Sequence, residues 1–235
     1  MINSRLRKVF SLLMLILFCA LSSCAYPEKL TQNNRVFSSS FEAESDFTGF
    51  YVVPQGEYDS SHELSSDNVY EGLLSHKAWI IKARDTDNDA LLYKPHRAYP
   101  TIQMYKSNQG SFVTPCLVSL KVYLDLTLAD KPSGSTDDWF SFATLSPDAS
   151  DMWTRTILVN TAPDGYVRLV HVPEQGRQEY VFQAESSNDP EGALLFPYRQ
   201  WVSFDIYIDL DDKNGYAKVW QDGVLVSHAY IKGGK

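Results

Sequence analysis

The sequence predicts an all-β protein built as a two-sheet antiparallel β-sandwich. Two long segments, CLVSLKVYLDLTL (residues 116–128) and WVSFDIYIDL (residues 201–210), alternate apolar and polar residues with the period of two typical of a half-buried strand. Turn sequences rich in Asn, Asp and Gly, such as DDKNG and QDG, separate the strand candidates. From Phe37 onward there is hardly any helical periodicity, and many strands separated by such turns indicate a sandwich.

Residues 1–23 have the pattern of a secretory signal peptide. Arg5, Arg7 and Lys8 precede an apolar run that ends in small residues. This run is too short and wrongly flanked for a helix that stays in the membrane. We therefore expect the fold to begin after this segment.

A cysteine follows the signal directly. LSSC, residues 21–24, resembles the lipobox of bacterial lipoproteins, in which the cysteine is acylated and becomes the first residue of the mature chain. The resemblance implies a lipid on Cys24 and a polar tether over residues 24–36. Because Ala25 rather than Asp follows the cysteine, it also implies an anchor in the bacterial outer membrane, on its periplasmic or cell-surface side. An ordinary signal peptide that ends near a cysteine is the alternative.

Charge and cysteine content exclude two classes of protein. Loss of residues 1–23 removes three positive charges, so the formal net charge goes from −8 to −11 for the 212 residues that remain. We expect no nucleic-acid binding from a chain this acidic. With Cys24 assigned to the lipid, Cys116 has no partner, so a disulfide framework is excluded and Cys116 is predicted to be a buried, unreactive thiol.

The sandwich is predicted over residues 37–235. Its strand candidates are, in chain order, HKAWIIKA (76–83), HRAYPTIQMY (96–105), CLVSLKVYLDLTL (116–128), WFSFATL (139–145), TRTILVN (154–160), GYVRLVHV (165–172), EYVFQA (179–184), WVSFDIYIDL (201–210) and YAKVWQ (216–221). In residues 201–210 every even-numbered residue is apolar, which places Ser203, Asp205, Tyr207 and Asp209 together on the opposite face.

Residues 96–105 carry an unusual strand face. With a period of two, Arg97, Tyr99, Thr101, Gln103 and Tyr105 share one side, and the other side is more apolar. A strand facing water normally shows Lys, Glu, Ser or Thr instead. Aromatic rings beside forked hydrogen-bond donors suit sugars, which have apolar C–H patches and polar edges. We therefore expect Arg97, Tyr99, Gln103 and Tyr105 to bind a carbohydrate substrate.

Several segments together resemble a known superfamily. NGYAKVWQDGVLV, residues 214–226, preceded by WVSFDIYIDLD, is similar to the concanavalin A-like jelly roll of lectins, laminin-G-like modules, glucanases and polysaccharide lyases. With HRAYPTIQ, SFATLSPDASDMWTRTILVN and GYVRLVHVP, it resembles the bacterial heparin-lyase-like and glucuronan- or alginate-lyase-like branch. The resemblance covers about residues 37–230 and implies a jelly roll that binds a polysaccharide. A fold alone does not assign an activity.

The resemblance also implies a reaction, β-elimination at a uronic acid. In such lyases a cation or amide neutralises the sugar carboxylate, and a tyrosine or histidine removes the C5 proton. It implies His171 as the imidazole base, and Tyr216 and Lys218 as a Tyr-x-Lys pair. Trp220 continues the face of that pair, and Asn160 is a further candidate to hold the carboxylate.

Each of these residues also has a structural interpretation. The segment with Tyr216 and Lys218 is equally an ordinary edge hairpin of the sandwich. His171 shares its strand face with Val167 and Leu169, so a core histidine is the alternative. The histidines of turn-rich or edge segments are expected to be solvated: His62, His76 and His228.

Metal and cofactor motifs are weak. Asp85, Asp87 and Asp89 have the spacing of a calcium loop, but Gly is missing at the sixth position and His96 stands where the loop needs Glu. We expect no cofactor and no catalytic metal, with a structural calcium as the alternative. Hydrolysis by a pair of carboxylates, Asp205 and Asp209, is a third alternative for the chemistry.

We therefore predict an envelope lipoprotein whose sandwich binds an acidic polysaccharide, with cleavage by elimination as an added hypothesis. The alternatives are a non-catalytic carbohydrate-binding or adhesion module and a structural envelope lipoprotein. The negative charge opposes a polyuronate, so cations must gather locally. Relatives of this architecture generally have one more strand after the Asp-Gly hairpin. The sequence ends with SHAYIKGGK, so we expect either that the final strand is supplied in a different way or that the domain is shortened.

Overall fold

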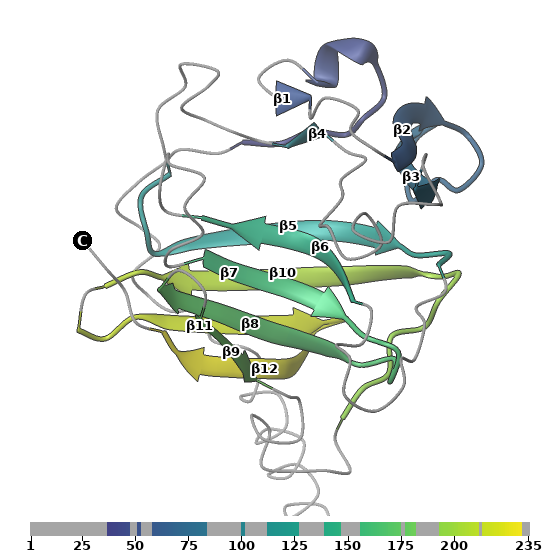
Figure 1. Cartoon of the computed structure of the whole chain (residues 1–235). Coiled ribbons are helices and arrows are strands. Elements are labelled where there is room, and N and C mark those ends of the chain that lie inside the picture. The colour runs from purple at the N-terminus through teal and green to yellow at the C-terminus, as the bar shows by residue number, and fades with distance from the viewer. Residues whose placement is uncertain are drawn as a thin grey trace, which may run out of the picture. The chain divides into compact units, whose positions relative to one another are not determined.

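A computed structural model describes ten stretches of the 235-residue chain: residues 37–47, 51–52, 58–83, 100–101, 112–126, 139–146, 156–174, 177–181, 193–211 and 213–231. All of them belong to one compact unit, Arg35–Lys235. Their regular structure is nearly all β-strand, which confirms the predicted fold class (Figure 1). Among the helices of these stretches, none has the length and apolarity needed to cross a bilayer.

The elements follow one another in this order: a 3-10 helix η2 (Glu44–Phe47), then β1 (Tyr51–Val52), β2 (Tyr58–Ser65), β3 (Ser75–Ala83), β4 (Pro100–Thr101), β5 (Cys116–Tyr123), β6 (Phe140–Leu145), β7 (Thr156–Thr161), β8 (Val167–Glu174), β9 (Arg177–Val181), β10 (Trp201–Asp209), β11 (Tyr216–Gln221) and β12 (Val224–Tyr230).

Two four-stranded antiparallel sheets form the body of the described structure. The β10 sheet has the strand order β12-β11-β10-β5, and the β7 sheet has the order β6-β7-β8-β9 (Figure 1). A β2–β3 hairpin and a short β1–β4 pair are separate two-stranded sheets. The jelly-roll connectivity stays a prediction.

One apolar core joins the inner faces of the two sheets. The even-numbered residues of β10, among them Phe204 and Ile206, pack in this core with Ile157 of β7 and Leu169 of β8. Phe204 is 1% exposed, and its ring centre lies 4.6 Å from that of Phe142 on β6. Burying a large apolar side chain contributes about 1.5–3 kcal/mol, so this face determines which way β10 is turned.

A two-residue turn closes the hairpin of β11 and β12. Gln221 pairs with Val224, and the two residues between them have positive φ, 48° at Asp222 and 79° at Gly223. Positive φ at both central positions is the property of a type I′ turn, for which Asp-Gly is a preferred pair. The Asp-Gly hairpin expected from the sequence is therefore present.

A β-bulge interrupts the same hairpin. The register shifts between Val219 and Trp220, so Trp220 pairs with Leu225, whereas Lys218 pairs with His228. An extra residue on one strand reverses the side on which later residues of that strand lie. The bulge therefore places His228 on the same face as Lys218.

The segment before β1 packs on the β2–β3 hairpin. The rings of Phe41 and Phe47 lie 5.2 and 5.3 Å from that of His76, and Phe47 lies 5.5 Å from His62. The carboxylate of Glu42 also accepts hydrogen bonds from the backbone N–H groups at the end of the hairpin turn. His62 and His76 are thus packed among aromatic rings, and the expectation that they are solvated is wrong.

Candidate functional site

The outer face of the β10 sheet gathers polar and aromatic side chains. Because the even-numbered residues of β10 enter the core, Ser203, Asp205, Tyr207 and Asp209 point away from it. This is the face that the alternation of residues 201–210 predicted. Residues paired across neighbouring antiparallel strands share a face, so the register extends it onto β11, β12 and β5.

Three predicted site residues of β11 lie on this face. Tyr216 pairs with Asp209, Lys218 with Tyr207, and Trp220 with Asp205. On the far side of β11, Lys218 pairs with His228 and Tyr216 with Tyr230. We call Tyr216, Lys218, Trp220 and His228 the Lys218 cluster.

Tyr216 and His228 form a short hydrogen bond. The Tyr216 Oη and His228 Nδ1 atoms are 2.6 Å apart. Burial, and then the neighbouring Tyr230, raise the pKa of Tyr216 above its ordinary value, so the phenol keeps its proton at neutral pH. Tyr216 therefore has a proton to donate to His228 Nδ1.

Lys218 is placed between two aromatic rings. Its Nζ atom lies 5.4 Å from the ring centre of Tyr216 and 5.9 Å from that of Trp220. An ammonium over a ring face is attracted by the ring's quadrupole, which restricts the rotamers of a long side chain. The cation of the cluster is therefore oriented while its side chain stays only half-buried.

The residues of the face differ in exposure. Tyr207 is 5% exposed and Trp220 is 9% exposed, whereas Tyr230 at the edge of the sheet is 82% exposed. Burial raises the pKa of Tyr207, with Asp209 as the next cause, so this phenol is also neutral at neutral pH. The half-buried Tyr216, Lys218 and His228 and the exposed Tyr230 are therefore more accessible than Tyr207 and Trp220.

A tight turn fixes where β11 begins. The Asp211 carboxylate accepts hydrogen bonds from the backbone N–H groups of Lys213 and Asn214, at 2.9 and 2.8 Å. A Cβ atom on Gly215 would lie only 2.5 Å from the carbonyl oxygen of Ile231. Only glycine fits this close approach, and it directly precedes Tyr216.

His171 lies elsewhere. It pairs with Ile157, whose side chain is in the core, so the imidazole is on the inner side of the β7 sheet. Its side chain is 3% exposed, and Nδ1 lies 3.4 Å from the Glu179 carboxylate. The structure therefore separates His171 from Tyr216 and Lys218, and its position corresponds to the core-histidine alternative.

Asn160 lies on the other, outer side of the β7 sheet. It pairs with Arg168, whose Nε donates to the Asn160 side-chain oxygen at 2.9 Å. Leu158, Val170 and Val172 form a buried apolar cluster on the same outer side. Asn160 is thus not brought together with the Lys218 cluster.

Four predicted carbohydrate-binding residues lie outside the described residues: Arg97, Tyr99, Gln103 and Tyr105. Of the strand expected over 96–105, the described part is β4, whose Thr101 pairs with Tyr51 of β1. Cys24, with the signal and tether, and the three aspartates of the calcium-like loop also lie outside the described residues.

His228 is the residue that sequence reasoning missed. It was expected to be solvated, but it is half-buried and bonded to Tyr216. A regular hairpin continued from the pair Gln221 and Val224 would set Ala217 opposite His228, on the core side. The bulge instead places His228 on the outer face, and the alternation of residues 216–230 did not predict a bulge.

The described residues include no group of three or more His, Cys, Asp or Glu side chains placed to hold a metal ion. Cys116 is half-buried at the start of β5, and burial raises the pKa of its thiol. A raised pKa keeps the sulfur protonated and a poor nucleophile.

Comparisons of this chain with protein-family models, with curated proteins and with solved structures found no match.

Proposed function

We propose that the outer face of the β10 sheet binds a polysaccharide and prefers sugars that carry a carboxylate. The observation that carries the proposal is the placement of Lys218 between the rings of Tyr216 and Trp220, with the exposed ring of Tyr230 next to Tyr216. The exposed ring of Tyr230 offers a stacking surface to the C–H patches of a sugar, and an oriented ammonium offers a partner to its carboxylate.

Local charge supports an acidic ligand although the whole chain carries a formal net charge of −8. Two carboxylates share this face, and each already accepts a hydrogen bond: Asp205 from the Ser119 hydroxyl at 2.5 Å, and Asp209 from the backbone N–H of Asp211 at 3.2 Å. Lys218 lies between their rows, opposite Tyr207. A bound carboxylate is then met first by the ammonium, and only at longer range by the acidic surface, whose effect salt screens.

The proposal includes the place of the protein in the cell. A lipid on Cys24 would tether the sandwich to the bacterial outer membrane, where envelope and extracellular polysaccharides are accessible. The support for this is the lipobox-like LSSC at residues 21–24 and the basic and apolar residues before it.

Binding is tested by titrating the purified full chain, with its lipid site intact, with alginate, glucuronan, heparin and a neutral glucan. We expect saturable binding of at least one uronate-containing glycan. Lys218→Gln should weaken that binding about tenfold, because it removes an oriented charge contact. Arg177→Gln on β9 removes one charge from the other sheet and should leave binding unchanged. Absence of binding across the panel overturns the proposal and favours a structural envelope lipoprotein.

β-Elimination is a second candidate function, favoured by the hydrogen bond between Tyr216 and His228 next to Lys218. In this reaction the C5–H bond and the bond from C4 to the leaving oxygen break, and a C4–C5 double bond forms. The Tyr216 oxygen accepts the C5 proton while its own proton passes to His228 Nδ1. The phenol then gives a proton to the leaving oxygen, and His228 returns its proton to Tyr216. Lys218 would neutralise the carboxylate that makes C5 acidic.

The same glycan panel tests the elimination through a different readout. An eliminating enzyme creates unsaturated uronate ends, which absorb in the ultraviolet, so absorbance should rise with time. Tyr216→Phe should abolish the rise while binding persists, since the ring and Lys218 remain. Tyr198→Phe, which removes a phenol bonded to Thr161 at 3.1 Å, is the matched control. Binding without any rise in absorbance identifies a carbohydrate-binding module.

A further inference from the structure

A second group of aromatic and cationic side chains lies on the same outer face, toward its other end. Trp201 of β10 pairs with Tyr123 of β5, and their ring centres are 5.7 Å apart. In the next row of that face, Lys121 pairs with Ser203, and its Nζ donates to the serine Oγ at 2.5 Å. The register therefore sets an ammonium beside two rings here too.

A residue from outside the β10 sheet completes this group. Tyr70 belongs to the turn between β2 and β3, and its ring lies 5.8 Å from that of Trp201, edge to face. The Lys121 Nζ atom lies 4.9 Å from the centre of the Tyr70 ring. Tyr70 is nevertheless 50% exposed, so part of its ring remains open to a ligand. We call Tyr70, Lys121, Tyr123 and Trp201 the Lys121 cluster.

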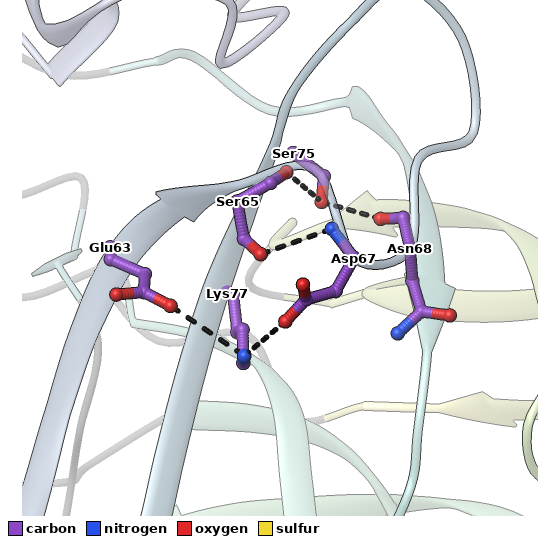
Figure 2. A network of polar contacts seen from close by, with 6 residues as sticks. All are labelled: Glu63, Ser65, Asp67, Asn68, Ser75 and Lys77. Atoms are coloured by element: carbon purple, nitrogen blue, oxygen red, sulfur yellow. Dashed lines mark hydrogen bonds and ion pairs between the residues drawn. The ribbon is translucent and has the colours of Figure 1, made fainter.

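Polar contacts restrain the base of the β2–β3 turn that carries Tyr70. Lys77 bridges the carboxylates of Glu63 and Asp67, at 3.5 and 2.5 Å, and the Ser75 hydroxyl donates to the Asn68 carbonyl at 2.6 Å (Figure 2). These contacts join the two ends of the turn, which limits its conformational freedom. A ring presented from a restrained turn loses little further entropy when it meets a ligand.

The spacing of the two clusters sets the size of a common ligand. Lys218 and Lys121 flank β10 on opposite sides, next to Tyr207 and Ser203 respectively. Four residues along a strand correspond to about 13 Å, and two strand spacings to roughly 10 Å. A ligand that reaches both ammonium groups must be extended and carry repeated negative charge.

We propose that the Lys121 cluster is a second subsite of the carbohydrate-binding face, so that the ligand is an extended oligosaccharide with carboxylates on separated sugars. This inference rests on the proposed function and names the ligand's length and charge pattern. One carboxylate meets Lys218 and another meets Lys121, while Tyr70 and Trp201 contact the sugar between or beyond them. Asp205 and Ser119 lie between the two clusters and are bonded to each other.

The test compares ligand lengths in calorimetric titrations of the full chain. The probes are defined alginate- and glucuronan-derived oligosaccharides, from one uronate to six. Wild-type affinity should rise with length. Lys121→Gln and Tyr70→Ala should each weaken binding of the hexamer about fivefold, the effect of losing one partly exposed charge or ring contact, and leave binding of the monomer unchanged. Lys218→Gln should weaken binding of both.

The outcomes separate this inference from the function on which it rests. If Lys218→Gln weakens hexamer binding and the two variants of the Lys121 cluster do not, the second subsite is wrong and the proposed function stands. If the wild-type chain binds no uronate oligosaccharide, both are wrong. Arg177→Gln controls for net charge, and unchanged thermal midpoints in all variants exclude misfolding as the cause.

Discussion

His62 and His76 are the clearest case in which the surroundings of a single residue change its chemistry. Their rings lie 5.4 Å apart, edge to face, and Phe41 and Phe47 pack against them. Burial, and then the charge that His62 carries when protonated, lower the pKa of His76 from 6.5 to about 4. The packing of residues 41–47 on the β2–β3 hairpin is therefore favoured by a neutral imidazole at His76.

The pKa of His76 predicts how stability depends on pH. Between pH 6.5 and about 4 the unfolded chain binds a proton at His76 that the folded chain does not bind. The free energy of unfolding should therefore fall as the pH is lowered through this window, and stay constant in this respect above pH 7. The loss should be on the order of 1–2 kcal/mol once partial exposure of the ring is allowed for.

Urea unfolding of wild type and of His76→Phe at pH 7, 5.5 and 4.5 measures this loss. The phenylalanine keeps an aromatic ring at the site and removes the titrating group, so its stability should fall less steeply with acid. An equal slope in the two proteins would show that His76 is not the group responsible. An NMR titration of the His76 ring measures its pKa directly.

At the scale of single elements, two glycines with different physical roles set the ends of β11, which carries most of the Lys218 cluster: Gly215 directly before the strand and Gly223 in the turn after it. Gly223 needs its positive φ of 79° for the type I′ turn, and a Cβ there would meet nothing within 4 Å. Gly215 has no such φ requirement, but a Cβ there would meet the Ile231 carbonyl oxygen at 2.5 Å and the Asp211 carbonyl oxygen at 3.0 Å. The cost of adding a side chain is therefore conformational at Gly223 and steric at Gly215.

This difference predicts unequal effects of the two alanine substitutions. Gly223→Ala should lower the free energy of unfolding by about 1–2 kcal/mol, the cost of a left-handed residue with a Cβ. Gly215→Ala should cost more than about 2 kcal/mol, because backbone atoms must move. It should also weaken ligand binding, since Tyr216 follows directly. Chemical unfolding measures both values, and the reverse order of the two costs would contradict the steric argument.

At the scale of the whole molecule, stability depends on the core between the two sheets. Phe204 of β10 touches Phe142 of β6, and the stacked ring of Phe196 lies 6.1 Å away. The ring therefore joins strands that are far apart in the sequence and that belong to different sheets. Because the inner-face side chains of these strands provide the stabilising apolar burial, the outer face of the β10 sheet can carry polar groups.

Removing that ring should destabilise the entire sandwich. Phe204→Ala should lower the free energy of unfolding by about 3–5 kcal/mol, from lost burial and the cavity left behind. Leu73→Ala, at a residue that is 78% exposed, should change it by less than about 0.5 kcal/mol. Both are measured by urea unfolding. A small effect of Phe204→Ala would mean that the two sheets do not depend on a shared core.

Alternation within several strands, together with the turn sequences between them, was enough to predict the fold class and part of the candidate site. The pattern of residues 201–210 separated the core residues Phe204 and Ile206 from Asp205 and Tyr207, because side-chain direction in a strand depends on local geometry alone. The same rule grouped Tyr216, Lys218 and Trp220 on one face. The Asp-Gly turn was also predictable, since its backbone conformation requires those residue types.

What lay beyond the sequence depends on contacts between distant segments. The alternation of side chains along the strand placed His171 on the same face as Val167 and Leu169. The packing of the two sheets was needed to show that this face lies in the core. A bulge moved His228 beside Tyr216, and the pairing of β10 with β5 brought Lys121 to the same face as Lys218. Pairing and register are set by the summed burial and hydrogen bonding of several strands. A single strand's own residues specify its two faces, but not its neighbours.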